Sequence, residues 1–170
     1  MNWTSIIIAL ISCLTFTSFV ILGVYKFTLL ASYSAYSSKW AEKVPIKGMN
    51  LWSIVTFTAA ILLVPVLIEL GVNNPWQFLG FFTPLYLILV SFTPEWQTNK
   101  SQYKVHVVGA LSCAIAAFGW LIFVQHQLLT VIVVADILLL ISLLTQTLKK
   151  SHIFWLEMIM FASVYISIFI

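Results

Sequence analysis

The chain contains no arginine and few charges of either sign: 8% of its 170 residues are charged, while 62% are hydrophobic. A soluble domain carries about 25% charged residues, so a chain this poor in charge cannot cover a folded surface in water. Its eight lysines form no basic stripe, which argues against nucleic acid as a partner. The composition predicts a protein whose solvent is the lipid bilayer.

The sequence also lacks the short motifs of common catalytic and metal sites. It has no G-x-S-x-G, no H-E-x-x-H and no phosphate-binding glycine loop. Its two cysteines, Cys13 and Cys113, both lie in apolar runs, and we interpret them as packing residues because a metal site needs more ligands. We therefore expect neither a metal nor a cofactor.

Six apolar segments are long enough to cross a hydrocarbon layer, which takes about 20 helical residues. They cover residues 5–25, 51–71, 76–93, 105–124, 129–148 and 153–170. No internal repeat or low-complexity linker divides them. The sequence thus predicts an all-α fold in which residues 1–170 form a single transmembrane domain, an integral membrane bundle of six helices.

The lysines indicate the orientation of these segments. All eight lie in the first, third or fifth connection: Lys26, Lys39, Lys43, Lys47, Lys100, Lys104, Lys149 and Lys150. Positive charge is retained on the cytoplasmic side of a membrane, so both termini are predicted to lie outside. The seven tryptophans agree, because each lies near a predicted helix end or in the first connection, as at a membrane interface. In that first connection, Tyr33, Tyr36 and Trp40 share one helical face, which is compatible with an extension of the first helix, an interfacial helix or an ordinary connector between spans.

Asp136 lies inside the apolar run VVADILLL, near the middle of the fifth segment. An ionised carboxylate at that depth costs about 2.5–3.5 kcal/mol or more, and such acids usually face the bundle interior or a wet cavity. We expect Asp136 to do so, either as a proton or ion relay or as a neutral acid that joins helices by a hydrogen bond. Tyr86, at a similar depth on the third segment, is a candidate neighbour.

Other polar candidates lie nearer the helix ends. Glu157 in HIFWLEM and His106 in KVHVVGA both lie near the cytoplasmic edge, where they either meet as an acid/base or hydrogen-bonded pair or remain separate. Glu69 lies near the outer end of the second segment, where its carboxylate can reach the interface. The small residues of GALSCAIAAFG, residues 109–119, predict a fourth helix at the centre of the bundle.

Three segments occur in order along the chain: SYSAYSSKW after the first predicted helix, YKVHVVGALS at the start of the fourth and FWLEM at the start of the sixth. Together they resemble an uncharacterised group of small multi-pass membrane proteins common in Bacteroidota and their mobile elements. The resemblance implies a multi-pass protein of a bacterial inner or plasma membrane. It supplies no catalytic residue.

The sequence favours a non-enzymatic membrane component over an enzyme. The favoured class is a small transporter, a channel subunit or a partner-binding module with a polar interior around Asp136. Its partners are the lipid bilayer and either further copies of the chain or another membrane protein. The alternative is an intramembrane or lipid-modifying enzyme that uses His106 and Glu157 at the cytoplasmic face.

Overall fold

The computed structural model describes residues 1–43 and 50–170, and this part of the chain is helical with no strand. Its long helices are α1 (Trp3–Phe27), α3 (Leu51–Leu70), α4 (Phe78–Ser91), α5 (Lys100–Phe123), α6 (Leu128–Leu144) and α7 (Leu148–Phe169). Between α1 and α3 lie a 3-10 turn, η1 (Tyr33–Ala35), and the short helix α2 (Tyr36–Lys43). The all-α prediction is therefore confirmed, and each of the six apolar segments is a helix.

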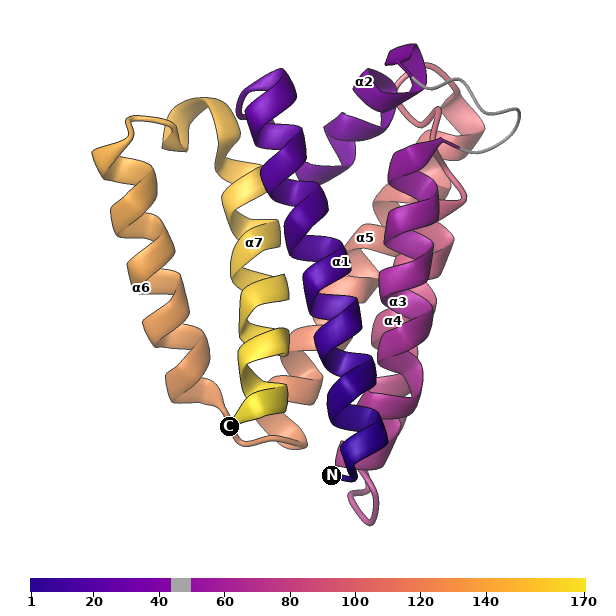
Figure 1. Ribbon diagram of the computed structural model, residues 1–170, viewed down its shortest axis with the longest axis vertical. Coiled ribbons are helices and arrows are strands. Elements are labelled where there is room, and N and C mark those ends of the chain that lie inside the picture. Colours follow the sequence, from indigo (N-terminus) through magenta and orange to yellow (C-terminus); the bar gives the residue numbers. More distant parts are fainter. Residues whose placement is uncertain (44–49) are drawn as a thin grey trace.

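The long helices lie side by side and alternate in direction, with both termini at one end of the bundle and α2 at the other (Figure 1). We call the end with α2 the lysine end and the opposite end the termini end. The described lysines all lie at or next to helix ends on the lysine end: Lys26, Lys39, Lys43, Lys100, Lys104, Lys149 and Lys150. Lys47, which belongs to the same predicted group, lies outside the described residues.

Four helices, α1, α3, α5 and α7, are long and apolar enough to cross a membrane. Two more, α4 and α6, are apolar but shorter, with 14 and 17 residues. Large apolar side chains also cover much of the outer surface, such as Leu14 on α1, Leu111 on α5 and Leu143 on α6. An apolar exterior around a packed core is compatible with a membrane protein.

Asparagines start three of the helices. The Asn2 and Asn50 side chains accept hydrogen bonds from backbone N–H groups three residues later, both at 2.9 Å, and Asn99 does the same for the start of α5. Such caps satisfy N–H groups that have no partner within the helix. The turns at the termini end each place a residue at positive φ, Asn73 at 69° and His126 at 54°, which reverses the chain within a few residues.

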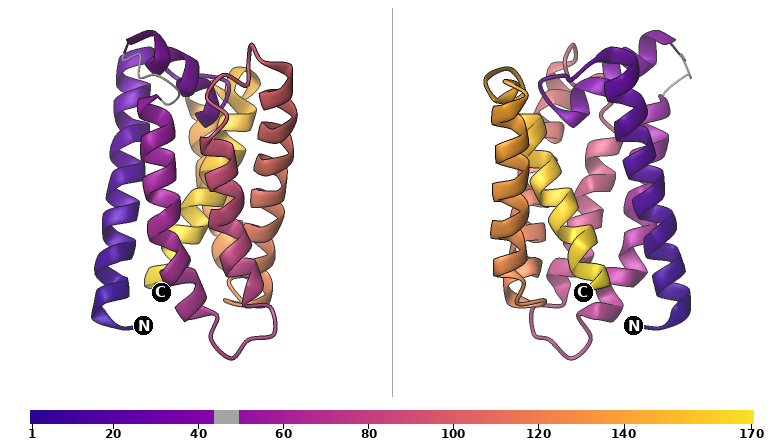
Figure 2. Two further views of the ribbon diagram at one scale, coloured as in Figure 1. Left: turned by 90° about the vertical axis from the view of Figure 1, so that its right-hand side faces the viewer. Right: turned by 60° about the vertical axis from the view of Figure 1, so that its left-hand side comes forward.

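Packing largely follows chain order. The most extensive contacts join α1 to α3, α3 to α4, α4 to α5 and α6 to α7. Helix α7 also contacts both α5 and α1, whereas α6 stands on the outside against α7 (Figure 2). The core holds several fully buried large side chains, including Trp52 on α3 and Trp120 on α5. These two tryptophans lie near helix ends as predicted, but inside the bundle rather than at its surface.

Three small residues of α5, Gly109, Cys113 and Gly119, face α4. A methyl group added at Gly109 would lie 3.1 Å from Cγ2 of Val90, and the Cys113 thiol donates to the Thr83 carbonyl at 3.3 Å. On its other side α5 is exposed, with Leu111 at 62%. The small residues therefore allow close packing against one neighbour, and the prediction that α5 lies at the bundle centre is wrong.

Gly80 lies at a close approach of three helices near the termini end. A Cβ atom at this position would lie 2.8 Å from the Leu67 carbonyl oxygen and 3.0 Å from Trp120 Nε1. Helices α3, α4 and α5 thus meet at a point that has no room for a side chain.

Candidate functional site

A cavity of about 490 Å³ lies between α5 and α7 in the half of the bundle nearer the lysine end. Its walls are mostly apolar and include Leu87, Val90, Ala110, Ala114, Phe118, Met160 and Phe161. Tyr33 and Ser34 of η1 line it as well. Of the five predicted polar candidates, His106 and Glu157 line this cavity, and the other three do not.

The cavity opens sideways, between two helices. Its lining includes Val107 and Leu111 of α5 and Ile153 and Leu156 of α7, all of which are exposed on the apolar outer surface. An opening of this kind connects the cavity to the surface that lipid would cover in a membrane. It favours ligands with a substantial apolar part.

Glu157, on α7, is half-buried and bound to the first connection. The backbone N–H of Tyr33 donates to Glu157 Oε2 at 2.5 Å, and the N–H of Phe154 donates to the Ala31 carbonyl at 3.0 Å. In the described part of the chain the one ion pair joins Lys39 to Glu42, so no cation of that part pairs with Glu157. One carboxylate oxygen is thus fixed by the backbone, and no side chain among the described residues neutralises the charge.

His106, on α5, is 4% exposed and is held by two neighbours. Its ring stacks on Trp96 with centroids 4.6 Å apart, and Nδ1 lies 2.8 Å from the hydroxyl of Thr93. That hydroxyl donates its single proton to the Val90 carbonyl at 2.6 Å, so it accepts from His106. Nδ1 therefore carries the proton, and Nε2 of the neutral ring is left as a hydrogen-bond acceptor.

Tyr33 connects the cavity to the core of the bundle. Its hydroxyl lies 2.9 Å from Thr56 Oγ1 of α3, and its ring packs at 5.0 Å from Phe16. Burial raises the pKa of Tyr33 above its usual value, so the phenol stays neutral at physiological pH. The predicted aromatic face of the first connection is real, since Tyr36 and Trp40 are also buried, but it forms a separate turn and helix rather than an extension of α1.

The site contains an acceptor on each of two facing helices, with apolar space beside them. His106 and Glu157 form no hydrogen bond with one another, so the predicted pair is an arrangement around shared space rather than a contact. The described residues hold no group of three His, Cys, Asp or Glu side chains suited to a metal ion. A ligand that donates hydrogen bonds from a polar end suits this geometry.

Asp136 lies elsewhere. It is exposed near the middle of α6, on the helix that stands outside the bundle, and it lines none of the cavities described here. The expectation of a polar interior around Asp136 is thus not met in a single chain. The pattern of hydrophobic residues does not predict this outer position of Asp136, because α6 is apolar on all sides and its sequence does not show which side packs.

Glu69 and Tyr86 occupy structural positions. The Glu69 carboxylate, near the end of α3, accepts from the backbone N–H of Asn2 at 2.8 Å and from the Ser5 hydroxyl, so it binds the start of α1. Tyr86 is half-buried on α4, where it stacks on Phe82 and lines a smaller cavity of about 220 Å³ with Ser112. Tyr86 and Asp136 share no cavity lining, so the structure does not bring them together.

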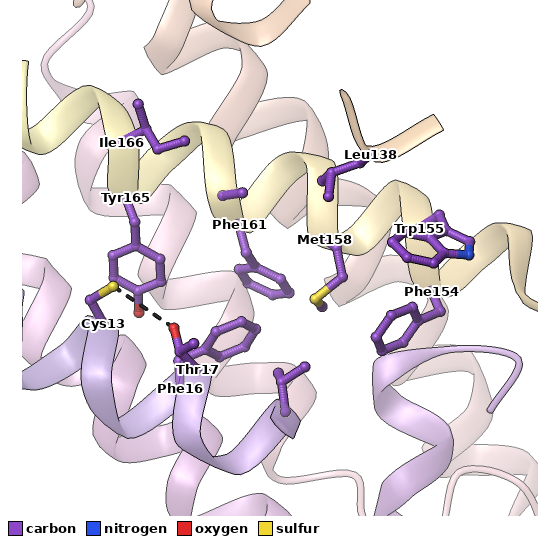
Figure 3. A pocket seen from close by; sticks show the side chains of 12 residues that line it. Cys13, Phe16, Thr17, Leu138, Phe154, Trp155, Met158, Phe161, Tyr165 and Ile166 are labelled. Atoms are coloured by element: carbon purple, nitrogen blue, oxygen red, sulfur yellow. Dashed lines mark hydrogen bonds between the residues drawn. The ribbon is translucent and has the colours of Figure 1, made fainter. Parts of the chain in front are cut away.

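A second groove, of about 410 Å³, lies between α1, α6 and α7 (Figure 3). Aromatic and aliphatic side chains of α7, including Met158 and Phe161, face Cys13 and Phe16 of α1 across it (Figure 3). The Cys13 thiol lies 3.9 Å from the Thr17 hydroxyl, within its own helix. No acid or histidine lines this groove, so it offers packing surface but none of the acceptor chemistry found at Glu157 and His106.

Sequence reasoning missed Thr93 and the backbone of Tyr33, which position the two candidates. Thr93 follows the end of α4, and no local pattern connects it with a histidine thirteen residues later. Comparisons with models of known protein families, with curated proteins and with solved structures found no match. The function is therefore argued from the geometry of the site.

Proposed function

We propose that the protein is a six-span membrane protein, with both termini outside, that binds a small amphiphile in the cavity between α5 and α7. The observation that carries this proposal is the pairing of two hydrogen-bond acceptors, Glu157 and His106 Nε2, with an apolar cavity that opens sideways. The apolar body of the ligand lies between the helices. Its head group, an ammonium or a hydroxyl, donates to the acceptors near the lysine end.

The topology is supported by charge and by length. The described lysines gather at one end of the bundle, as expected for a cytoplasmic face. At 1.5 Å per residue, α4 and α6 extend about 21 and 25 Å, and they run between the same two ends as the four longer helices (Figure 1). Helices of this length can cross where the bilayer thins locally to match them, at a cost that grows with each Å of mismatch.

The ligand class follows from the charge of the site. Glu157 has no cationic partner among the described residues, and a carboxylate in an apolar cavity is stabilised by a positively charged or proton-donating group. An anionic head group would instead be repelled. This combination supports a non-enzymatic binding or transport role, with the polar interior at Glu157 and His106 in place of Asp136.

The test compares three bromoalkyl probes of equal chain length that carry an amine, an alcohol or a carboxylate. Each is titrated into protein in nanodiscs of zwitterionic lipid, and quenching of tryptophan fluorescence reports contact, since Trp96 lies against His106. The amine is expected to bind saturably, the alcohol more weakly and the carboxylate without saturation. Glu157→Gln should weaken binding of the amine at least tenfold.

Glu95→Gln is the matched control, because it removes an exposed acid that does not line the cavity. It should leave the affinity for the amine unchanged. Equal affinities for the amine and the carboxylate, or equal effects of the two substitutions, would refute the proposed ligand class.

A second candidate function is a lipid-modifying enzyme, favoured by the presence of an acid and a base in one cavity. In that case Glu157 and His106 Nε2 would exchange protons with a lipid head group near the cytoplasmic face. Incubation of the purified protein with total bacterial lipid, followed by mass spectrometry, tests this. An altered head group that disappears with His106→Phe would favour the enzyme over the binding protein.

A further inference from the structure

Helix α6 has a large surface that the rest of the described chain does not cover. Of its 17 residues only Val134 and Ser142 are buried, and both lie on the side that packs against α7, together with Leu138 of the groove. On the opposite side lies a stripe of exposed residues, which we call the outer stripe: Leu129, Val133, Asp136, Leu140 and Leu143. Among them Asp136 is the one polar residue.

The outer stripe has the spacing of a helix-pairing seam. Its members follow one another at intervals of four, three, four and three residues, the repeat by which two parallel helices interlock along their length. A single polar residue within such a seam fixes its register. Val133 and Leu140 flank Asp136 on either side and would pack against the same residues of a partner.

Asp136 cannot reach water from this position if α6 spans the membrane. It is the ninth of 17 residues, about 12 Å from either helix end at 1.5 Å per residue. Its side chain is too short to extend to the interface as a lysine does. The described lysines lie at or near helix ends at the lysine end, so no lysine within residues 1–43 and 50–170 lies at the depth of Asp136.

We infer that the outer stripe is the interface of a homodimer, in which α6 of two copies pairs in parallel about a two-fold axis. The two copies share one orientation in the membrane, so the axis brings Asp136 against Asp136 of the partner subunit. Two carboxyl groups that both carry a proton can bind each other, because each O–H then donates to the carbonyl oxygen of the other. Self-pairing of one patch is also the commonest symmetry of homo-oligomers. The inference depends on the proposed membrane span of α6, but not on the proposed ligand.

The first test is disulfide cross-linking in native membranes. Single cysteines are placed on the outer stripe by Val133→Cys or Leu140→Cys, in a chain that also carries Cys13→Ser and Cys113→Ser. Ile137→Cys and Ile141→Cys are matched controls, since both positions are exposed on α6 but lie off the stripe. Oxidation should link the stripe variants into dimers at least five times as efficiently as the controls. Equal linking at all four positions, or none, would overturn the inference.

The second test keeps the native cysteines and measures the mass of the detergent complex by light scattering over a range of concentrations. The wild-type chain should form a dimer of 19.2 kDa subunits, and Asp136→Asn should retain it because an amide also donates and accepts. Asp136→Leu should raise the dissociation constant at least tenfold, while Ile137→Leu should not. A wild-type chain that stays monomeric, as it would if Asp136 paired with a basic residue of another protein, contradicts the inference.

Failure of the underlying topology is recognised separately. Labelling of Leu128→Cys and Thr145→Cys with a membrane-impermeant reagent places the two ends of α6 on opposite sides if the helix spans. Labelling of both ends from one side would refute the span, whereas opposite sides without dimerisation would refute the interface alone.

Discussion

Replacement of Thr93 by valine should destabilise the protein more than replacement of the histidine that it binds. Thr93 and His106 are each 4% exposed and are joined at 2.8 Å. In Thr93→Val the buried Nδ1–H of His106 has no acceptor, and an unsatisfied buried donor costs about 1–3 kcal/mol. The Val90 carbonyl does not add to this loss, because it still accepts from the backbone N–H of residue 93 at 3.1 Å.

His106→Phe removes the same bond from the other side with a smaller effect. The phenyl ring can keep the stack on Trp96, and the Thr93 hydroxyl remains bound to Val90. The lost bond then costs about 0.5–1.5 kcal/mol. The double variant leaves no donor unsatisfied, so its loss should be about that of His106→Phe alone. The coupling between the two positions is therefore about 1 kcal/mol or more.

The assay is reversible unfolding in mixed micelles with increasing SDS, followed by tryptophan fluorescence. Thr93→Ser retains the hydroxyl and serves as the control, in which the coupling to His106 should persist. A second cycle with His106→Phe and Glu157→Gln should be additive within about 0.5 kcal/mol, because these two side chains share a cavity but no bond. Additivity between Thr93→Val and His106→Phe would refute the hydrogen-bond assignment and with it the free Nε2.

Three further predictions concern topology, packing and the start of α1. In intact cells a membrane-impermeant thiol reagent should label Asn73→Cys, whereas Lys150→Cys should react only after permeabilisation; the opposite result would invert the orientation. Gly80→Ala should lower the free energy of unfolding by about 1–3 kcal/mol, since its methyl group meets a backbone carbonyl. Gly119→Ala should have the smaller effect, because it meets only the end of a leucine side chain, and a reversed ranking in the SDS assay would contradict the packing. Glu69→Ala should speed hydrogen exchange over residues 2–8 with little change at α7, and unchanged exchange there would show that the carboxylate does not hold α1.

The positions of the helices could be predicted from the sequence because length and hydropathy are local properties. The start of α3 and the end of α5 fall within a residue of their predicted places. The beginning of α5 does not: this helix extends about one turn beyond the apolar segment, through Lys100 to its cap at Asn99. In α7 a first turn from Leu148 precedes a kink at Ser151, where the backbone is not helical, so the regular helix begins close to the predicted residue 153. Hydropathy marks the start of an apolar run, whereas a capped helix begins at its cap.

Side-chain partners were harder to predict, and the errors have a common cause. The depth of a residue along a helix follows from its position in the sequence. Counting residues from the helix ends therefore predicts that His106 and Glu157 lie near the same end of the bundle, and both line one cavity there. Which side of a helix packs depends instead on its neighbours in the fold. The sequence of an evenly apolar helix does not show which side that is. The sequence therefore predicts Asp136 inside the bundle, whereas it lies on the outer side of α6. Reasoning from side-chain types could not identify the backbone N–H of Tyr33 as the hydrogen-bond donor to Glu157.

The hydrogen bonds between the first connection and the last helix bear on the order in which the chain assembles. Tyr33 and Glu157 are 124 residues apart, and the bond between Phe154 and Ala31 spans nearly the same interval. During synthesis η1 is therefore complete long before α7 exists. Until α7 has been made, the backbone N–H of Tyr33 has no Glu157 carboxylate to which it can donate. The cavity wall is therefore closed only after α7 has been synthesised. A chain released before α7 would present an open half-site.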